Sequence, residues 1–226
     1  MKHISRIVIV GLGGVGTRIA PILCQYLTYE QPGLPVFLID GDKFEPKNAQ
    51  RQIFTSLGNK AEVTAGQLRK DFPELSIEAK TQFVTDDNVY IYIPEGSLVF
   101  CCVDNHASRK LLSEHCRSLE NTTLISGGNE FDDGNIQVYI RESGKNLTPP
   151  LTHLHPEIMR PKDRNPAELD CMELSAAGTP QLIFANVKVA TEMLCAFWVV
   201  TKKEVVFSEV YFDLKTGAQR PILRKE

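Results

Sequence analysis

Short apolar runs, each closed by polar or glycine residues, divide the first half of the chain into expected strands. Three such runs cover 6–10, 36–39 and 98–103. Runs of this length without polar interruption are typical of strands buried on both faces of a parallel sheet. Two more strands are expected at 77–84 and 123–126, and the second is followed by a Gly-Gly pair.

Between these runs, apolar residues recur at intervals of three or four, which is the spacing of one helix face. The segment after Gly14 has such a stripe, formed by Val15, Ile19, Leu23 and Tyr26. Pro21 lies inside that segment and removes a backbone donor, so we expect a kink or an early end of the helix there. Two more helices are expected at 60–72 and 108–119.

The order of these elements predicts the fold class. Strands alternate with helices up to about residue 126, which is typical of a doubly wound α/β domain. Residues 135–140 then alternate apolar and polar side chains, as an exposed antiparallel strand does. We therefore predict a Rossmann-like, mostly parallel sheet with an antiparallel extension, in a single domain spanning 1–226.

Residues 143–170 differ in composition from the rest of the chain. They hold five prolines, two histidines and many charged residues. A segment this long is more than a simple connector between elements of a compact domain. We expect a Pro-rich crossover loop here, with His153 and His155 as ordinary surface side chains.

Residues 182–200 form the one long apolar stretch, which is nearly long enough to span a bilayer. Because Asn186, Lys188 and Glu192 interrupt it, we expect a helix buried in the core or in a subunit contact and no membrane association. Phe184, Phe197 and Trp198 would make it an aggregation liability in a monomer, so a homodimer is expected.

Composition narrows the class of protein further. The net charge of −3 does not suggest a nucleic-acid partner. The chain enters its first strand by about residue 5, so no N-terminal signal is expected. The six cysteines lack the spacing of a disulfide framework, which favours reduced thiols and a cytoplasmic location. No two of them have C-x-x-C spacing, so no zinc is expected.

A glycine pattern, G-x-G-G-x-G, follows the first expected strand. It comprises Gly11, Gly13, Gly14 and Gly16. Between a strand and a helix, such glycines permit a tight turn and bring phosphate close to the helix N-terminus. Asp40 ends the second strand at the distance expected for an acid that bonds a ribose hydroxyl. These features predict nucleotide binding, but they do not distinguish NAD, FAD and ATP.

The residues after Asp40 favour a triphosphate. This stretch contains a cluster of amide, guanidinium, ammonium and carboxylate groups: Asp42, Asn48, Arg51, Gln52 and Lys60. Arg51 can pair with two phosphate oxygens at once, and Lys60 can act as a point charge. Asp42 is either a turn residue or a secondary ligand.

Asp104 directly follows the strand at 98–103. The carboxyl ends of parallel strands meet at the crevice where open α/β sheets bind ligands. Beside a triphosphate, the Asp104 carboxylate is a natural ligand for Mg²⁺. Its alternative role is that of a helix N-cap for the residues that follow.

Taken together, these strings resemble the ThiF/MoeB/HesA family, the ubiquitin-activating type of adenylyltransferase. The resemblance lies in G-L-G-G-V-G, then D-G-D-K-F-E-P-K-N-A-Q-R-Q, then K-A-E-V and C-V-D-N-H-A-S-R, and it covers roughly residues 5–130. It implies an enzyme that uses ATP and Mg²⁺ to adenylate the C-terminal carboxylate of a small β-grasp protein with a glycine tail. Arg51, Lys60 and Asp104 would be catalytic, and the glycines, Asp40, Asp42, Asn48 and Gln52 would bind the nucleotide.

The resemblance resumes weakly around Cys171, which matches the position of a sulfur-carrier or thioester cysteine in some members of the family. We therefore include Cys171 among the candidate catalytic residues, with a small buried thiol as the alternative. The N-terminal R-Y-x-R-Q helix of relatives is absent. Two other functions stay open: a nucleotide-binding scaffold or regulatory protein without chemistry, and an NAD(P)-dependent oxidoreductase.

Overall fold

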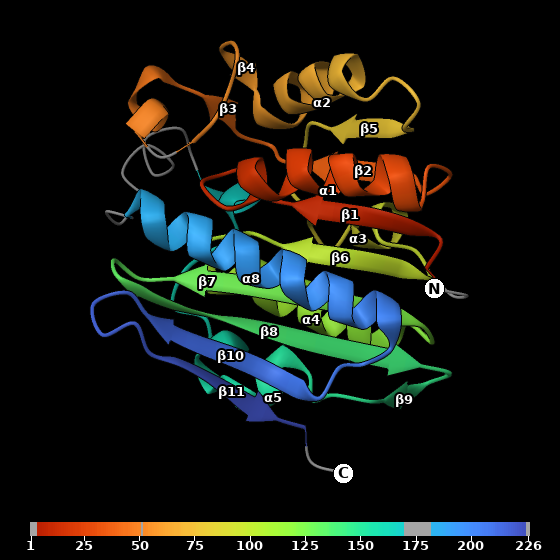
Figure 1. The fold of residues 1–226 in the computed structure, drawn as a ribbon, viewed down its shortest axis with the longest axis vertical. Helices are drawn as coiled ribbons and strands as arrows, with labels where there is room; N and C mark the ends of the chain where they lie inside the picture. The colour runs from red at the N-terminus through yellow and green to blue at the C-terminus, as the bar shows by residue number, and fades with distance from the viewer. Residues whose placement is uncertain (1–3, 51, 170–181, 225–226) are drawn as a thin grey trace.

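The computed structural model describes residues 4–50, 52–169 and 182–224. Within these residues, a nine-stranded sheet runs through the molecule in the order β11-β10-β8-β7-β6-β1-β2-β5, with β9 paired to β8 (Figure 1). A separate short hairpin joins β3 (Lys43–Phe44) to β4 (Gly58–Asn59). This arrangement confirms the predicted α/β fold, with a parallel part and an antiparallel extension.

Five parallel strands make up the first part of the sheet: β1 (Arg6–Val10), β2 (Val36–Ile39), β5 (Ile77–Lys80), β6 (Ser97–Cys101) and β7 (Thr122–Asn129). Their residues are buried on both faces in β1, β2 and β6. β1 lies between β2 and β6, so the strand order reverses there. Ligands of doubly wound sheets bind at such a point.

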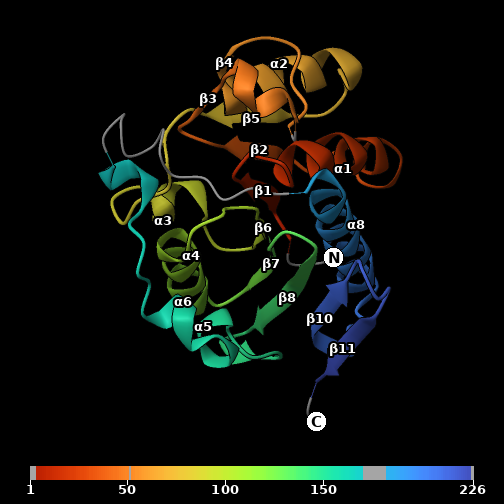
Figure 2. The same ribbon diagram turned by 90° about the vertical axis from the view of Figure 1, so that its left-hand side faces the viewer.

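Helices cover both faces of the sheet (Figure 2). One face packs against α1 (Gly16–Glu30), α2 (Lys60–Asp71) and α8 (Ile183–Lys202). The other face packs against α3 (Val89–Tyr92), α4 (His106–Ser118), α5 (Leu151–Leu154) and α6 (Pro156–Met159). In β1, Ile7 and Ile9 point to the first layer while Val8 points to the second, as the two-residue period of a strand requires.

The helix α1 runs through Pro21 to Glu30, so the expected early end is wrong. Ile19 and Leu23 are fully buried on its inner face. Burial of this stripe offsets the backbone hydrogen bond that proline cannot make.

The antiparallel extension consists of β8 (Asp133–Glu142), β10 (Phe207–Asp213) and β11 (Gln219–Leu223), with β9 (Lys145–Asn146) at one end. The expectation that 135–140 is exposed is wrong, because all residues from Ile136 to Ile140 are buried. Ile136 and Val138 face the layer of α8, and Tyr139 faces the layer of α4 and α5. Successive side chains of β8 therefore point alternately into two layers that are both buried.

The Pro-rich segment is more ordered than the expected loop. It contains β9, the short helices α5 and α6, and the 3₁₀ turn η2 (Pro166–Glu168), and α5 and α6 pack against α4. Asp163 accepts hydrogen bonds at 2.8 Å from the backbone N–H groups of both His106 and Ala107 at the start of α4. This segment is therefore held on the helix layer.

The helix α8 is long and apolar enough to cross a membrane by length and composition. It lies instead along β7 and β8 and against α1, with Val189 and Met193 fully buried (Figure 1). Phe197 is also buried, so it does not belong to an exposed patch, whereas Phe184 and Trp198 do. The helix is thus a core element with one outward face.

His155 is not the surface histidine that its loop position suggested. Its Nε2 lies 2.6 Å from Glu209 Oε1 on β10, and its Nδ1 lies 2.8 Å from Glu157 Oε1 on α6. Tyr211 also contacts both His155 and Glu209. The bond with Glu209, followed by the bond with Glu157, raises the pKa of His155 against the opposing effect of burial. When the imidazole is protonated, both of its N–H groups can donate to these carboxylates, which ties the start of α6 to the sheet.

We predict that His155 stabilises the fold in a pH-dependent way. Its pKa is raised above the value of 6.5 expected in the unfolded chain, so its contribution is fully present below pH 6.5. The contribution is lost as the pH rises through the raised pKa of the folded state. Urea unfolding of the wild-type protein and His155→Gln should therefore show a larger difference in unfolding free energy at pH 6 than at pH 8.5.

The matched control is His153→Gln, because His153 is exposed on the neighbouring helix α5. It should give little difference at either pH. A destabilisation by His155→Gln that is equal at both pH values would show that the imidazole acts through packing and not through its charge.

Candidate nucleotide site

At two positions, the glycine loop between β1 and α1 is packed too closely against other backbone atoms for a side chain. Gly11 has a φ of 90°, and a Cβ there would lie 2.9 Å from the carbonyl carbon of Cys102. A Cβ on Gly16 would lie 2.0 Å from the carbonyl oxygen of Gly11. These contacts bring the start of α1 against the ends of β1 and β6.

The loop presents backbone donors without acceptors. The N–H groups of Gly13, Gly14 and Val15 have no hydrogen-bond acceptor among the described residues, whereas the carbonyl of Gly13 accepts from Thr17 Oγ1 at 2.7 Å. The first turn of α1 has no acidic residue, and no side chain caps the helix. A helix N-terminus with open N–H groups and a positive dipole end favours a bound anion.

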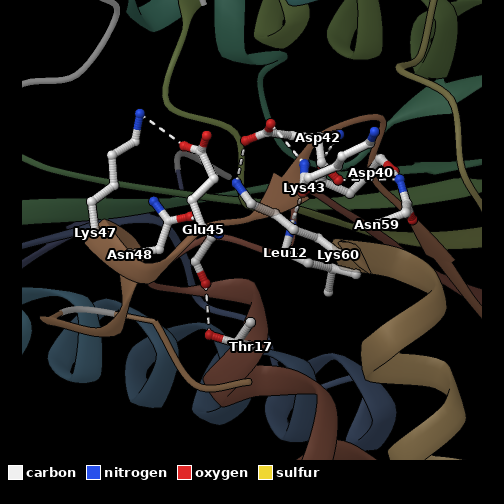
Figure 3. A network of polar contacts seen from close by, with 11 residues as sticks. Leu12, Thr17, Asp40, Asp42, Lys43, Glu45, Lys47, Asn48, Asn59 and Lys60 are labelled. Carbon is white, nitrogen blue, oxygen red and sulfur yellow. Dashed lines mark hydrogen bonds and ion pairs between the residues drawn. The ribbon is translucent and has the colours of Figure 1, made fainter. Parts of the chain in front are cut away.

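Asp40 connects the glycine loop to the next segment of the site. Its Oδ2 accepts from the N–H of Leu12 at 2.6 Å, and its Oδ1 accepts from the N–H of Asp42 at 2.9 Å (Figure 3). Burial raises the pKa of this carboxyl, and the nearby Lys60 and the two N–H groups oppose that effect. A carboxylate has about four lone-pair sites, so it can still accept from a ribose hydroxyl.

Lys60 begins α2 and points back toward Asp42 (Figure 3). The Nζ of Lys60 lies 2.5 Å from Asp42 Oδ2. The lysine side chain is 8% exposed and the aspartate side chain is 48% exposed. Asn59 caps α2 and also donates to the carbonyls of Asp40 and Asp42, at 2.9 and 3.1 Å. The cation is thus held at a fixed place beside Asp40.

Asn48 and Gln52 lie in the segment that follows β3. The Oδ1 of Asn48 accepts from the N–H of Glu45 at 2.8 Å, so this buried amide shapes the turn. Gln52 is 7% exposed, and its Oε1 has no hydrogen-bond partner within the described parts of the chain. Its Nε2 lies near Gly13. An unpartnered polar atom buried beside the loop is a natural contact for a ligand. Arg51 lies outside the described residues.

Asp104 is exposed at the carboxyl end of β6 and lines the same cleft as the glycine loop. It is not the helix cap, because Asn105 performs that role by accepting from the N–H of Ser108 at 2.8 Å. The Asp104 carboxylate therefore remains available to face a ligand.

Arg109, the last residue of the D-N-x-x-x-R string, has a structural role in this arrangement. Its guanidinium donates to the carbonyls of Val103 and Gly127 and to Ser126 Oγ, at 2.6, 2.8 and 2.7 Å. It thereby joins the ends of β6 and β7 under the cleft. The sequence motif marks this residue, but its contacts become clear only from the structure.

One large cleft, of about 2010 Å³, brings most of the predicted site residues together. They are Gly11, Gly13, Gly14, Asp40, Asp42, Asn48, Gln52, Lys60 and Asp104. Gly16 lies behind the loop, in contact with Gly11. The cleft extends past β7 to β8 and β10, and it also touches Lys162 and Arg164 of the Pro-rich segment, which were not predicted.

The residues at the cleft fit a magnesium ion that is bound together with a nucleotide. No group of three or more His, Cys, Asp or Glu side chains that could hold a metal occurs within the described parts of the chain. Mg²⁺ is commonly held by one or two carboxylates, with phosphate oxygens and water completing its octahedron. Asp104 supplies one such carboxylate, and Asp42 lines the same cleft.

Burial makes three of the five described cysteines poor nucleophiles, including the one that lines the cleft. Cys102 lines it, but burial raises the pKa of this thiol well above its usual range. Burial likewise raises the pKa values of Cys24 and Cys116 to about 12. A reactive cysteine requires the thiolate form. Cys171, the predicted candidate, lies outside the described residues.

The fold and the cleft define a Rossmann-like α/β protein with a glycine loop and an acid at its switch point. Comparison with known proteins specifies the class further. Residues 2–208 match the ThiF family, and the chain belongs to this family.

Two relatives from Escherichia coli show the range of activities among similar proteins. The tRNA threonylcarbamoyladenosine dehydratase is 31% identical over 153 residues, which are 65% of this chain and 55% of that protein. The sulfur carrier protein ThiS adenylyltransferase is 29% identical over 178 residues, which are 77% of this chain and 65% of that protein. The chain thus spans between half and two thirds of the length of these relatives.

Solved structures agree on the fold. E. coli MccB in complex with succinimide has a TM-score of 0.73 at 18% identity, covering 98% of this chain and 64% of that chain. PaaA has a TM-score of 0.71 at 13% identity, covering 97% of this chain and 72% of that chain. The antiparallel extension therefore belongs to an arrangement that distant proteins share.

We predict that Gly16→Ala weakens nucleotide binding at least tenfold and destabilises the protein. A methyl group at this position cannot fit beside the carbonyl of Gly11 without moving the loop. Calorimetric titration with ATP and Mg²⁺, together with urea unfolding, measures both effects.

Gly66→Ala is the matched control, since nothing lies within 4 Å of the position of its Cβ in α2. It should keep nucleotide affinity and raise stability by about 0.5–1 kcal/mol, the usual gain in a helix interior. Normal binding by a folded Gly16→Ala variant would contradict the close approach inferred for the loop.

Proposed function

We propose that this protein is an ATP-dependent adenylyltransferase that activates the C-terminal carboxylate of a small β-grasp protein with a glycine tail. The observation that carries the proposal is the meeting of three features in one cleft. These are the open N–H groups of the glycine loop, the side chains of Asp40 and Lys60, and the exposed carboxylate of Asp104. Family membership supports it, because the ThiS adenylyltransferase of E. coli acts on a sulfur carrier protein by its name.

The proposed reaction needs no base from the protein. A carboxylate oxygen of the partner bonds to the α-phosphorus of ATP, the bond from that phosphorus to the oxygen of the β-phosphate breaks, and pyrophosphate leaves with the electron pair. The attacking group is already an anion near pH 7. The task of the site is therefore to align the two reactants and to offset the negative charge.

Each candidate residue has a part in that task. The N–H groups of Gly13 and Gly14 would hold phosphate oxygens, and Asp40 would accept from the ribose. Lys60 would move from Asp42 toward the phosphates, and Arg51 would pair with them. Asn48 shapes the turn that carries these residues, and Gln52 would bond the nucleotide. Asp104 would hold Mg²⁺, which when bound supplies positive charge against the phosphate oxygens.

The width of the cleft supports a second, elongated substrate. The nucleotide end of the cleft continues past Gly127 and Gly128 to Asn135 on β8 and Tyr211 on β10. We assign this extension to the tail of the partner. The net charge of −3 does not favour a nucleic acid, although one relative acts on tRNA by its name. We place the reaction in the cytoplasm.

Adenylation by this route requires no thiol of the protein. A later transfer to sulfur would need a thiolate that attacks the acyl adenylate. Cys171 is our candidate for that second step alone, and a Cys171→Ala variant should keep the first step.

ATP–pyrophosphate exchange is the direct test of the proposed function. We expect exchange that depends on Mg²⁺ and on a β-grasp partner with a free C-terminal carboxylate. The same partner carrying a C-terminal carboxamide is the control and should give none. Exchange that depends on tRNA and not on the β-grasp partner would change the substrate class. Tighter binding of NAD than of ATP would contradict the proposed reaction itself.

We predict that Asp104→Ala lowers the exchange rate by about a hundredfold or more, as expected for loss of a principal electrostatic stabiliser. The variant should keep the melting temperature of the wild type, because Asp104 is exposed and does not cap α4. Asp87→Ala is the control, since Asp87 is also exposed but does not line the cleft. Near-normal ATP–pyrophosphate exchange by Asp104→Ala would show that Asp104 does not hold the metal.

We predict a homodimer that buries the outward face of α8. Its exposed residues follow a helical stripe of Phe184, Val187, Thr191, Cys195 and Trp198. The adjacent helix α1 adds Ile22 and Tyr29, which are 53% and 82% exposed. An apolar face of this kind marks an interaction surface.

Light scattering should give the mass of a dimer at micromolar concentration, and Trp198→Asp should give a monomer. Tyr90→Asp is the control, because Tyr90 is also a large, exposed aromatic residue but lies on α3, on the opposite face of the sheet. A monomeric wild-type protein would refute this prediction.

A further inference from the structure

Asn186, near the start of α8, is a buried amide without a partner. Its exposed fraction is 0%, and neither its Nδ2 nor its Oδ1 has a hydrogen-bond partner among the residues that the structure describes. Its neighbours on the same helix face are the apolar residues Ala185, Val189 and Ala190. Because buried polar groups in native proteins are nearly always hydrogen-bonded, an amide with both ends open calls for a partner that the ligand-free form lacks.

The amide lies against the glycine loop. A Cβ on Gly14 would lie 2.3 Å from Asn186 Nδ2 and 2.7 Å from its Cγ. Gly14 does not have a positive φ, unlike Gly11, so backbone conformation does not demand glycine there. The close contact with Asn186 accounts for the missing side chain.

The loop is held on its other side by α1. Arg18 donates to the carbonyl of Gly14 at 2.5 Å, and Thr17 donates to the carbonyl of Gly13 at 2.7 Å. The peptide N–H groups between these anchors have no acceptor among the described residues. The Gly13–Val15 backbone is therefore the part of the loop that a phosphate would engage, and Asn186 is the polar side chain behind it.

We propose that Asn186 is a positioning residue for the nucleotide loop. When the loop closes on a phosphate group, its backbone shifts against α8, and the amide of Asn186 gains a hydrogen bond to that backbone. The open amide of the ligand-free form destabilises that form relative to the bound one, so Asn186 strengthens nucleotide binding without touching the nucleotide. This inference rests on the proposed ATP binding.

The test compares ATP·Mg²⁺ affinity and ligand-free stability in two variants. Asn186→Ala and Asn186→Leu remove the open amide, so the ligand-free melting temperature should stay the same or rise in at least one of them. Both should bind ATP about tenfold more weakly, which corresponds to about 1.4 kcal/mol. A general structural defect would instead lower stability and affinity together.

Ser113→Ala is the matched control. Ser113 in α4 is also fully buried, and its Oγ also lacks a partner among the described residues, but α4 lies on the opposite face of the sheet from α8 and Asn186. Its removal should leave ATP affinity unchanged. Unchanged affinity in both Asn186 variants would overturn the proposal and leave the proposed function intact, whereas a wild-type protein that binds no ATP would refute both.

Hydrogen–deuterium exchange of the wild-type protein gives a readout that does not depend on either variant folding. ATP·Mg²⁺ should slow exchange at the first turns of α8, around residues 186–190, as well as in the glycine loop. Protection confined to the loop would overturn the proposal, because α8 would then not respond to the nucleotide.

Discussion

The structure depends on the close approach of the glycine loop to the ends of three other elements. Gly11 lies against the backbone at Cys102 after β6, Gly16 lies against Gly11, and Gly14 lies against Asn186 on α8. Protein interiors are close-packed, so a methyl group added at one of these glycines must displace a neighbouring atom. The loop therefore fixes the relative position of β1, β6, α1 and α8, and the cleft exists where their ends meet. Stability and the proposed nucleotide binding would consequently depend on the same contacts.

The buried carboxylate of Asp40 determines how the charged groups of the cleft are arranged. Asp40 accepts from the N–H groups of Leu12 and Asp42, so it holds the glycine loop and the following segment together. Lys60 offsets part of the cost of burying this charge, and its own partner is the more exposed Asp42. The Asp42 carboxylate reaches water while the Lys60 ammonium group does not, so a phosphate could replace Asp42 as the partner of this buried cation. The Lys60 ammonium group therefore lies beside the place where the phosphates of a nucleotide would bind.

The sequence predicted the parts of the fold whose signals are local. The strands at 6–10 and 36–39 and the helix from Lys60 follow from apolar runs and helical spacing, and the structure confirms them. Errors arose where distant elements decide the outcome. β8 is buried because α5 and α8 cover its two faces, and His155 is only half-buried but is paired because β10 places Glu209 beside it. Likewise, motif spacing marked Asp40 and Lys60, whereas Asn186 stood out only as a polar interruption of an apolar stretch, because its contact lies in the distant glycine loop.

The helix α8 connects the two halves of the proposed function. Its inner face carries Asn186 against the nucleotide loop, and its outer face carries the stripe from Phe184 to Trp198. A helix transmits small displacements along its axis because its backbone hydrogen bonds keep it stiff. Two copies joined through this stripe would therefore place their nucleotide loops on one continuous packed layer. In the proposed dimer, a shift of α8 that satisfies Asn186 in one subunit would reach the contact with the other subunit, so the dimer would be part of the site and not merely a consequence of apolar surface.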